Sequence, residues 1–207
     1  TLNNMALIHE EQKNYDKAIL FYKEAIKIAH SIGDKENIRI YLTNLGQTYS
    51  TLKQYNEAIT CYQEAKEIDI LIGDKNGIAN RLNNIGLIYK NMGNYQEAIE
   101  ILSKSIELAR TISNKITLAS SLNSLGLIYY ITKHYEKAIF YYNDALAVFE
   151  EMKDVVSSAT LGWNIGTAYE SIGKYSNAIF YYEKAIECYQ NIGKINKVSE
   201  IKIRIEN

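Results

Sequence analysis

The chain has 207 residues, and its 23 lysine and arginine residues nearly balance its 24 aspartate and glutamate residues. Hydrophobic residues make up 47% of it, which is typical of a globular protein and excludes a disordered or collagen-like chain. The net charge of -1 offers no basic field and no apolar run could span a bilayer, so we expect neither nucleic acid nor a membrane as a partner.

One pattern recurs along the chain at a spacing of 40 residues, which predicts a repeat protein. Its most regular position holds a small residue, in chain order Ala6, Gly46, Gly86, Gly126 and Gly166. Tyrosines and alanines recur in step with it, among them Tyr15, Tyr55, Tyr95, Tyr135, Tyr175, Ala18, Ala58, Ala98, Ala138 and Ala178. No copy needs an insertion, and the pattern divides the chain into repeats at about 1–33, 34–73, 74–113, 114–153 and 154–193.

The second repeat illustrates the local structure that each copy predicts. Leu45, Tyr49 and Leu52 are spaced i, i+4 and i+7, which places them on one face of a first helix. Ala58 and Tyr62 begin the apolar stripe of a second helix, and the polar residues between the two stripes mark a tight turn. Each copy is therefore predicted to be a helical hairpin.

The junctions between repeats have helix-ending and helix-starting residues. Gly73 suits the left-handed conformation that ends a helix, and Asp74 is a good N-cap for the next one. Ser113 and Lys153 take the place of this glycine in later copies, so we expect weaker C-caps there.

The last residues, 194–207, keep the register of the repeat but lose its glycine, because Glu206 stands where the next glycine is due. Val198, Ile201 and Ile205 still form an apolar stripe. We expect a helix that caps the last hairpin or begins a degenerate sixth repeat, since an array needs a covered end.

These residues resemble the signature of the tetratricopeptide repeat (TPR) family, a resemblance carried in the second copy by Leu42, Leu45, Gly46, Tyr49, Ala58, Tyr62 and Ala65. It implies an all-α, right-handed superhelical solenoid of five TPR-like hairpins plus the capping helix, forming a single domain over 1–207. Because the first residue is not Met and lies within the repeating pattern, we expect this domain to be a fragment of a longer protein. The family's usual period is about 34 residues, so the extra residues here are expected to lengthen the second helix. This long form is similar to the repeats of Leu-Gly-Asn adaptors, kinesin light chains and bacterial peptide-sensing regulators.

Motifs of catalysis or cofactor binding are missing from the sequence. It contains no glycine-rich phosphate loop, no zinc-binding pattern and no EF-hand, and its three histidines (His9, His30 and His134) have no metal-binding or catalytic partner at a workable spacing. We therefore predict no enzyme, no cofactor and no metal site. With two cysteines and no signal-like start, the chain fits a reducing compartment, and we expect it in the cytoplasm.

In the resembled family, one side of each first helix lines a concave peptide-binding groove. The matching positions here hold Asn44, Asn80, Asn83, Asn84, Leu87, Lys90, Asn123, Leu127, Tyr130, Trp163 and Asn164. An Asn side chain has the donors and acceptor of a backbone amide, so a column of them could pair with an extended peptide. The alternative is that these asparagines tie adjacent repeats together.

We accordingly predict a non-catalytic protein–protein interaction module that binds a peptide or protein segment in its groove, with Trp163 and Tyr130 as apolar anchors. The predicted groove has one lysine, Lys90, and no arginine fork for a carboxylate, which favours an uncharged or mixed polar–apolar partner. The alternative is a sensory, regulatory or self-associating domain of a larger bacterial signalling protein (a kinase, transcription regulator or NTPase). Such a domain could form homo-oligomers through the ends of the array.

Overall fold

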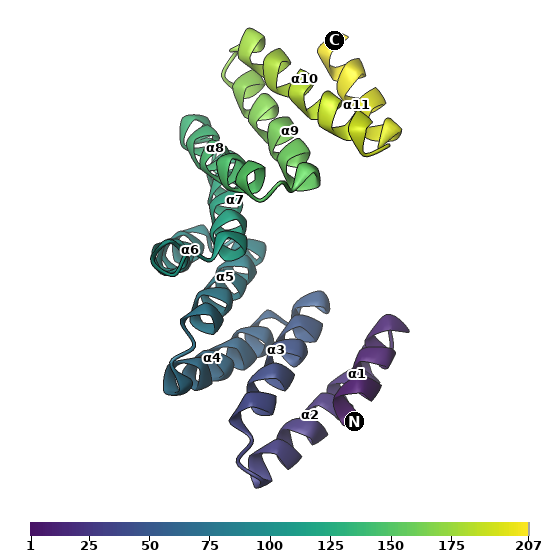
Figure 1. Ribbon diagram of the computed structural model, residues 1–207, viewed down its shortest axis with the longest axis vertical. Helices are drawn as coiled ribbons and strands as arrows, with labels where there is room; N and C mark the ends of the chain where they lie inside the picture. The colour runs from purple at the N-terminus through teal and green to yellow at the C-terminus, as the bar shows by residue number, and fades with distance from the viewer. Residues whose placement is uncertain (207) are drawn as a thin grey trace. The chain divides into compact units, whose positions relative to one another are not determined.

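The computed structural model describes residues 1–206, which form eleven α-helices and no strand (Figure 1). In chain order these are α1 (Leu2–Glu11), α2 (Tyr15–Ser31), α3 (Lys35–Thr51), α4 (Tyr55–Ile72), α5 (Lys75–Met92), α6 (Tyr95–Thr111), α7 (Lys115–Ile131), α8 (Tyr135–Glu151), α9 (Val155–Ser171), α10 (Tyr175–Asn191) and α11 (Ile195–Glu206). Each predicted repeat holds two of them joined by a short turn, so the all-α class and the helical hairpins are confirmed. None of these helices is long and apolar enough to cross a membrane.

The contacts within the chain divide it into two compact units. Unit 1 runs from Thr1 to Leu108 and unit 2 starts at Ala109, so the boundary lies within α6. The single domain over residues 1–207 stays a prediction.

In unit 1, each helix from α1 to α4 packs against the next one along the chain, up to α5. Tyr22 and Tyr62, which recur at the same position of the second helix, are almost fully buried. The small residue of the repeat lies opposite this ring, and a Cβ added at Gly46 would lie only 3.0 Å from Cε1 of Tyr62. Tyr22 and Tyr62 are therefore core residues, whereas Tyr175, from the other recurring tyrosine position, is 65% exposed.

Unit 2 repeats this arrangement with closer contacts. A Cβ added at Gly126 would lie 2.4 Å from Cδ1 of Tyr142, and one at Gly166 would lie 2.6 Å from Cδ1 of Tyr182. The predicted capping helix over residues 194–207 is α11, which packs on α10; its predicted last residue, 207, lies outside the described part of the chain. Val198 and Ile201 of α11 are buried, so this helix covers the apolar side of the last hairpin.

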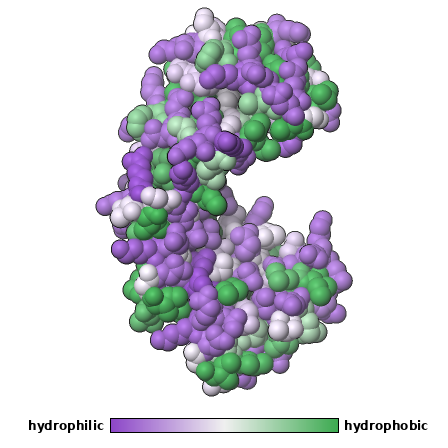
Figure 2. All heavy atoms as spheres, viewed as in Figure 1, coloured by the Kyte–Doolittle hydropathy of each residue, from purple (hydrophilic) through white to green (hydrophobic). Residues whose placement is uncertain are grey.

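Hydrophobic residues left at the surface form separate patches among hydrophilic ones on the face of each unit that Figure 2 shows. Within unit 2, Phe140 and Phe180 occupy the same repeat position and remain 59% and 51% exposed. Scattered apolar residues of this kind are common on soluble domains and do not by themselves mark a binding site.

The predicted junction residues behave as expected. The side chains of Asp34, Asp74, Asn114 and Asp154 each accept a hydrogen bond from a backbone N–H in the first turn of the helix that follows. Gly73 has a φ of +75°, and Ser113, which replaces the glycine in the next copy, is held at +56°. That conformation is strained for a residue with a Cβ, which makes this C-cap the weaker one.

In the second repeat the two helices of the hairpin are nearly equal in length, with 17 residues in α3 and 18 in α4. The sequence had suggested that the extra residues lengthen the second helix, and in this repeat the second helix is one residue longer than the first. Because Asp74 caps α5 directly after Gly73, the residues between the junction and the next repeat glycine are helical as well.

Candidate peptide-binding site

The predicted groove residues of unit 1 lie on two first helices, Asn44 on α3 and Asn80, Asn83, Asn84, Leu87 and Lys90 on α5. We call this set the candidate face of unit 1. Asn80 is exposed, Asn84 and Leu87 are half-buried, and Asn83 is 8% exposed. Their spacing of three or four residues brings the α5 members onto one side of that helix. Burial lowers the pKa of Lys90, so its charge is partly desolvated.

Asparagines of the candidate face of unit 1 make contacts within the protein. The side-chain amide of Asn44 donates to Oδ1 of Asn3 on α1 at 3.1 Å, which links two repeats. Asn83 donates to Oδ1 of its neighbour Asn84 at 3.5 Å. Asn44 therefore makes the contact between repeats that the structural interpretation expects, while Asn80 is exposed and Asn84 is half-buried on α5.

The candidate face of unit 2 consists of Asn123, Leu127 and Tyr130 on α7 together with Trp163 and Asn164 on α9. All five side chains are half-buried. Oδ1 of Asn123 is buried and has no hydrogen-bond partner. The hydroxyl of Tyr130 lies 3.5 Å from Oγ of Ser171, so this ring reaches from α7 to the end of α9.

Trp163 is not a bare apolar anchor, because α11 contacts it. The guanidinium carbon of Arg204 lies 5.3 Å from the centroid of the Trp163 ring, and Nε of Arg204 donates to Glu170 Oε2 at 2.8 Å. The same carboxylate oxygen accepts a hydrogen bond from the hydroxyl of Tyr182 at 2.6 Å. Trp163 in turn packs against the Tyr182 ring at a centroid distance of 5.4 Å.

This cluster shifts the titration of its members. Burial would raise the pKa of Glu170, but the hydrogen bonds from Arg204 and Tyr182 outweigh it and lower that pKa. Burial and the bond to Glu170 raise the pKa of Tyr182 to about 12. At neutral pH the carboxylate is therefore ionised and the phenol is protonated, as a carboxylate-centred cluster requires.

Arg204 was missed as a groove residue, although the sequence carries a signal for it. It stands two positions before the expected sixth glycine position, in the same column as Asn44, Asn84 and Asn164. The helix α11 therefore brings a groove position of a sixth, degenerate repeat into unit 2. Because the glycine itself was lost at 206, the column seemed to end at the fifth repeat.

A second missed feature is a buried charge cluster in unit 1. The side chain of Asp69 on α4 is 0% exposed, and its carboxylate lies 3.4 Å from Nη1 of Arg39 on α3 and 3.3 Å from Nε of Arg81 on α5. Gly77 makes room for it, since a Cβ there would lie 2.4 Å from Asp69. Burial raises the pKa of Asp69 and lowers that of Arg81, against the attraction between the two charges.

All four residues of the charge cluster depart from the repeat. Where Asp69 stands, other copies have alanine or an aromatic residue; where Arg39 stands, later copies have alanine. Arg81 replaces tyrosine, serine or leucine, and Gly77 replaces asparagine, threonine or serine. These four departures from the repeat were the sequence signal for the charge cluster, but the sequence alone did not show that the four residues meet in the fold.

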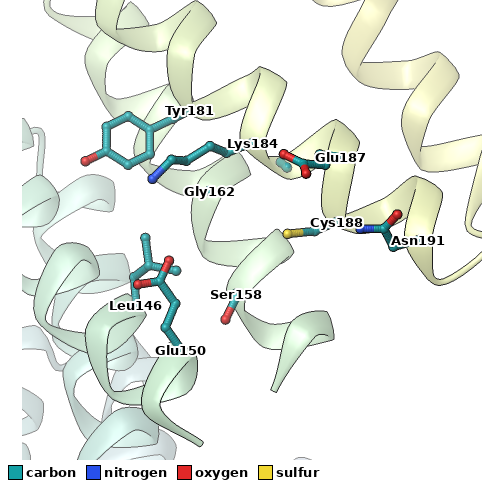
Figure 3. Close-up of a pocket in the computed structure, with 10 residues that line it drawn as sticks. Leu146, Glu150, Ser158, Gly162, Tyr181, Lys184, Glu187, Cys188 and Asn191 are labelled. Carbon is teal, nitrogen blue, oxygen red and sulfur yellow. The ribbon is translucent and has the colours of Figure 1, made fainter. Parts of the chain in front are cut away.

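A cavity of about 230 Å³ opens between α8, α9 and α10 in unit 2 (Figure 3). Glu150 and Ser158 lie on one side of it and Lys184 and Cys188 on the other. Gly162 of α9 stands where repeats two to four have leucine, and it lets α9 approach α10. The lining mixes both charges with a thiol whose pKa is raised by burial, which is not the setting of a reactive cysteine.

Comparison with known proteins identifies the family. The tetratricopeptide repeat model matches residues 1–70 and 77–151, and a second tetratricopeptide repeat model matches residues 163–191. The chain therefore belongs to the tetratricopeptide repeat family, whose fold is generally a non-catalytic interaction scaffold. A search of the curated proteins finds no match.

Solved structures of similar fold come from several bacterial and archaeal proteins. BtubC (BKLC) from P. vanneervenii has a TM-score of 0.83 and 20% identity, covering 93% of this chain and 80% of that one. The Rap conjugation gene regulator of plasmid pLS20, in complex with the Phr* peptide, has a TM-score of 0.73 and 18% identity, covering 96% and 55%. A signal transduction ATPase with a tetratricopeptide repeat sensor from Pyrococcus horikoshii has a TM-score of 0.80 and 22% identity, covering 97% and 31%. At these identities the likeness shows the fold.

Proposed function

We propose that this chain is a non-catalytic module that binds an extended peptide or protein segment along the first-helix side of its repeats, the predicted concave groove. The proposal depends on one observation: each candidate face has an amide side chain and an apolar side chain about one helical turn apart, and both are half-buried. Asn84 and Leu87 are half-buried on α5, and Asn123 and Leu127 are half-buried on α7. Such side chains are shielded enough to strengthen a hydrogen bond and still open to a ligand.

Amide side chains suit the backbone of an extended peptide, because each offers two donors and an acceptor. The buried and unpartnered Oδ1 of Asn123 supports this role, since a buried acceptor without a hydrogen bond costs about 1–3 kcal/mol. A bound N–H group would remove that cost. The Rap regulator of similar fold, which is in complex with the Phr* peptide, lends further support to a peptide ligand.

The charges near the candidate faces favour an uncharged or mixed polar–apolar segment. Glu10 at the N-terminal end accepts hydrogen bonds from the hydroxyls of Tyr22 and Thr48, so its carboxylate is already engaged. Lys90 is partly desolvated, and a single lysine lacks the fork that binds a carboxylate in two places. Glu10 and Lys90 therefore give no preference for a strongly acidic or strongly basic ligand.

The test begins by selecting peptides from a displayed random library on the immobilised protein. Their affinity is then measured for Asn84→Ala, for Asn123→Ala and for the double variant. Each lost hydrogen bond should weaken binding about five- to tenfold, from roughly 1 kcal/mol per bond. Asn56→Ala and Asn177→Ala, which change exposed asparagines on the second helices α4 and α10, are the matched controls.

Two outcomes would contradict the proposal. Selected peptides that bind the double variant as tightly as the unchanged protein would remove the candidate faces from the binding site. A loss of binding that is accompanied by an equal loss of helical circular dichroism would return the asparagines to a structural role.

The second candidate function is a sensory or self-associating domain of a larger cytoplasmic signalling protein. The signal transduction ATPase of similar fold has a tetratricopeptide repeat sensor, which lends support to this candidate function. Light scattering after size-exclusion chromatography tests the self-association. A mass of twice 23.7 kDa would support it, and a mass of 23.7 kDa at all concentrations would contradict it.

A further inference from the structure

The end of unit 2 holds a carboxylate and an aromatic ring that share one cation. The guanidinium of Arg204 lies over Trp163 and pairs with Glu170. We propose that Trp163 and Glu170 form a subsite for an arginine side chain of the bound segment, and that Arg204 of α11 occupies this subsite until the segment displaces it. The inference rests on the proposed peptide-binding function and names one chemical requirement of the partner.

The subsite is built without help from Arg204. Tyr182, which is 2% exposed, donates its hydroxyl to Glu170 and so fixes the position of the carboxylate. The Tyr182 hydroxyl also lies 3.2 Å from Oγ1 of Thr167, and its ring packs against Trp163. The aromatic face and the carboxylate are thus oriented by the core of the α9–α10 hairpin. A guanidinium matches this pair better than an ammonium, because it stacks on a ring while its N–H groups reach the carboxylate.

Arg204 is held loosely enough to be replaced. Its side chain is 38% exposed and that of Glu170 is 36% exposed, and an ion pair this open to water contributes little. The buried anchors of α11, Val198 and Ile201, precede Arg204 in the helix, which ends at Glu206. Ile205, next to Arg204, also packs against the core of unit 2, so the exchange needs only the exposed side chain of Arg204 to swing away while α11 stays docked.

The first repeat provides an internal comparison. Glu10 occupies the repeat position of Glu170 and also accepts a tyrosine hydroxyl, that of Tyr22. The residue that follows in the amide column is Asn44 there and Arg204 here, and the tryptophan occurs once in the sequence. The C-terminal end of unit 2 therefore departs from the repeat, because it brings together a carboxylate, an indole ring and a cation from the same chain.

Trp163 is the one tryptophan of the chain, so its fluorescence reports on this subsite directly. The probe is the acetylated and amidated peptide Ala-Ala-Arg-Ala-Ala, compared with the same peptide carrying citrulline, the uncharged isostere of arginine. In the Arg204→Gln variant the arginine peptide should bind about five- to tenfold tighter than in the unchanged protein, because the competing cation is gone. Lys202→Gln, on the exposed side of the same helix, should leave the affinity unchanged.

Three results would overturn the inference. The first is that Arg204→Gln and the unchanged protein bind the arginine peptide with equal affinity. The second is that Arg204→Gln binds the citrulline peptide as tightly as the arginine peptide. The third is that adding Glu170→Gln leaves the gain intact. Arg204→Lys, which keeps a cation in cis, should give an intermediate affinity, and an affinity as high as that of Arg204→Gln would mean that α11 had simply undocked. Because the Asn84 and Asn123 variants test the peptide-binding faces separately, failure here with those effects intact removes the subsite alone.

Discussion

Replacing Asp69 with alanine should destabilise unit 1 far more than a typical charge removal. Asp69 is 0% exposed, and within residues 1–206 it is the one carboxylate paired with Arg81, whose side chain is 9% exposed. Arg39 keeps Asp74 and Glu36 as partners after the change, but Arg81 is left as a buried charge. Breaking a buried pair from one side costs about 3–5 kcal/mol.

The net stabilisation that the Asp69–Arg81 pair contributes is much smaller than the cost of removing one of its two partners. Burial raises the pKa of Asp69 and lowers that of Arg81, so desolvation opposes the charged form of both groups. Replacing a buried pair by apolar residues is often neutral or stabilising by about 1–4 kcal/mol. The double variant Asp69→Ala with Arg81→Leu introduces residues that other copies have at these positions, such as Ala109 and Leu161. It should recover at least about 2 kcal/mol of the loss.

Urea unfolding followed by circular dichroism measures both effects. With a slope of about 2 kcal/mol per molar urea, Asp69→Ala should lower the midpoint of unfolding by about 1.5–2.5 M. The control Glu67→Ala, an exposed change on the same helix, should shift stability by no more than about 0.5 kcal/mol. A loss below about 1 kcal/mol for Asp69→Ala, or a double variant no more stable than the single one, would refute the reasoning.

Two further predictions concern the helix contacts and the junctions. Gly126→Ala should lower the free energy of unfolding by about 1–3 kcal/mol, because the new Cβ would lie 2.4 Å from the buried Tyr142 ring. Gly46→Ala should be nearly neutral, because its Cβ would lie 3.0 Å from the Tyr62 ring and alanine favours a helix over glycine by up to about 1 kcal/mol. Equal losses at the two glycines in urea unfolding would contradict this. Asp154→Ala should cost about 1 kcal/mol at neutral pH and Asp154→Asn much less, because either an aspartate or an asparagine can cap α9. Side-chain and backbone hydrogen bonds from Ser157 lower the pKa of Asp154. The stabilisation is therefore present above the ordinary pKa of about 3.9 and is lost as the pH falls through the lowered value. A cost of Asp154→Ala that does not decrease as the pH is lowered below the ordinary pKa would be inconsistent with this.

The fold was predictable because each structural signal is written several times. A single glycine followed by a tyrosine three residues later means little, but the recurrence at Gly46, Gly86, Gly126 and Gly166 fixes both the helices and the side on which they meet. The same argument placed Tyr62 on the apolar stripe of its helix, and this side chain is buried. The register even extended into α11, where the apolar stripe predicted the buried side correctly.

The candidate site was only partly predictable, because a column of equivalent residues need not have equivalent surroundings. Asn44 and Asn84 share a repeat position, yet Asn44 is bonded to Asn3 of the preceding repeat. Trp163 was predicted as an open apolar anchor, and its cover by Arg204 depends on where the last helix docks. Periodicity says which side of a helix a residue is on, but contacts between helices decide what else is there.

The features that distinguish this chain from a bare array are its departures from the repeat, and they fall into two physical kinds. At Asp69 the departures are matched to one another inside the protein: a carboxylate, two guanidinium groups and the space at Gly77 close a buried cluster. At Trp163 the match is made by a side chain that remains more than a third exposed, so the cluster stays accessible to a competitor. A buried cluster such as that at Asp69 can affect only folding. A partly exposed cluster such as that at Trp163 can exchange its internal partner for a ligand. Substitutions at Asp69 should therefore change stability without a specific effect on peptide charge preference, and substitutions at Glu170 should do the reverse.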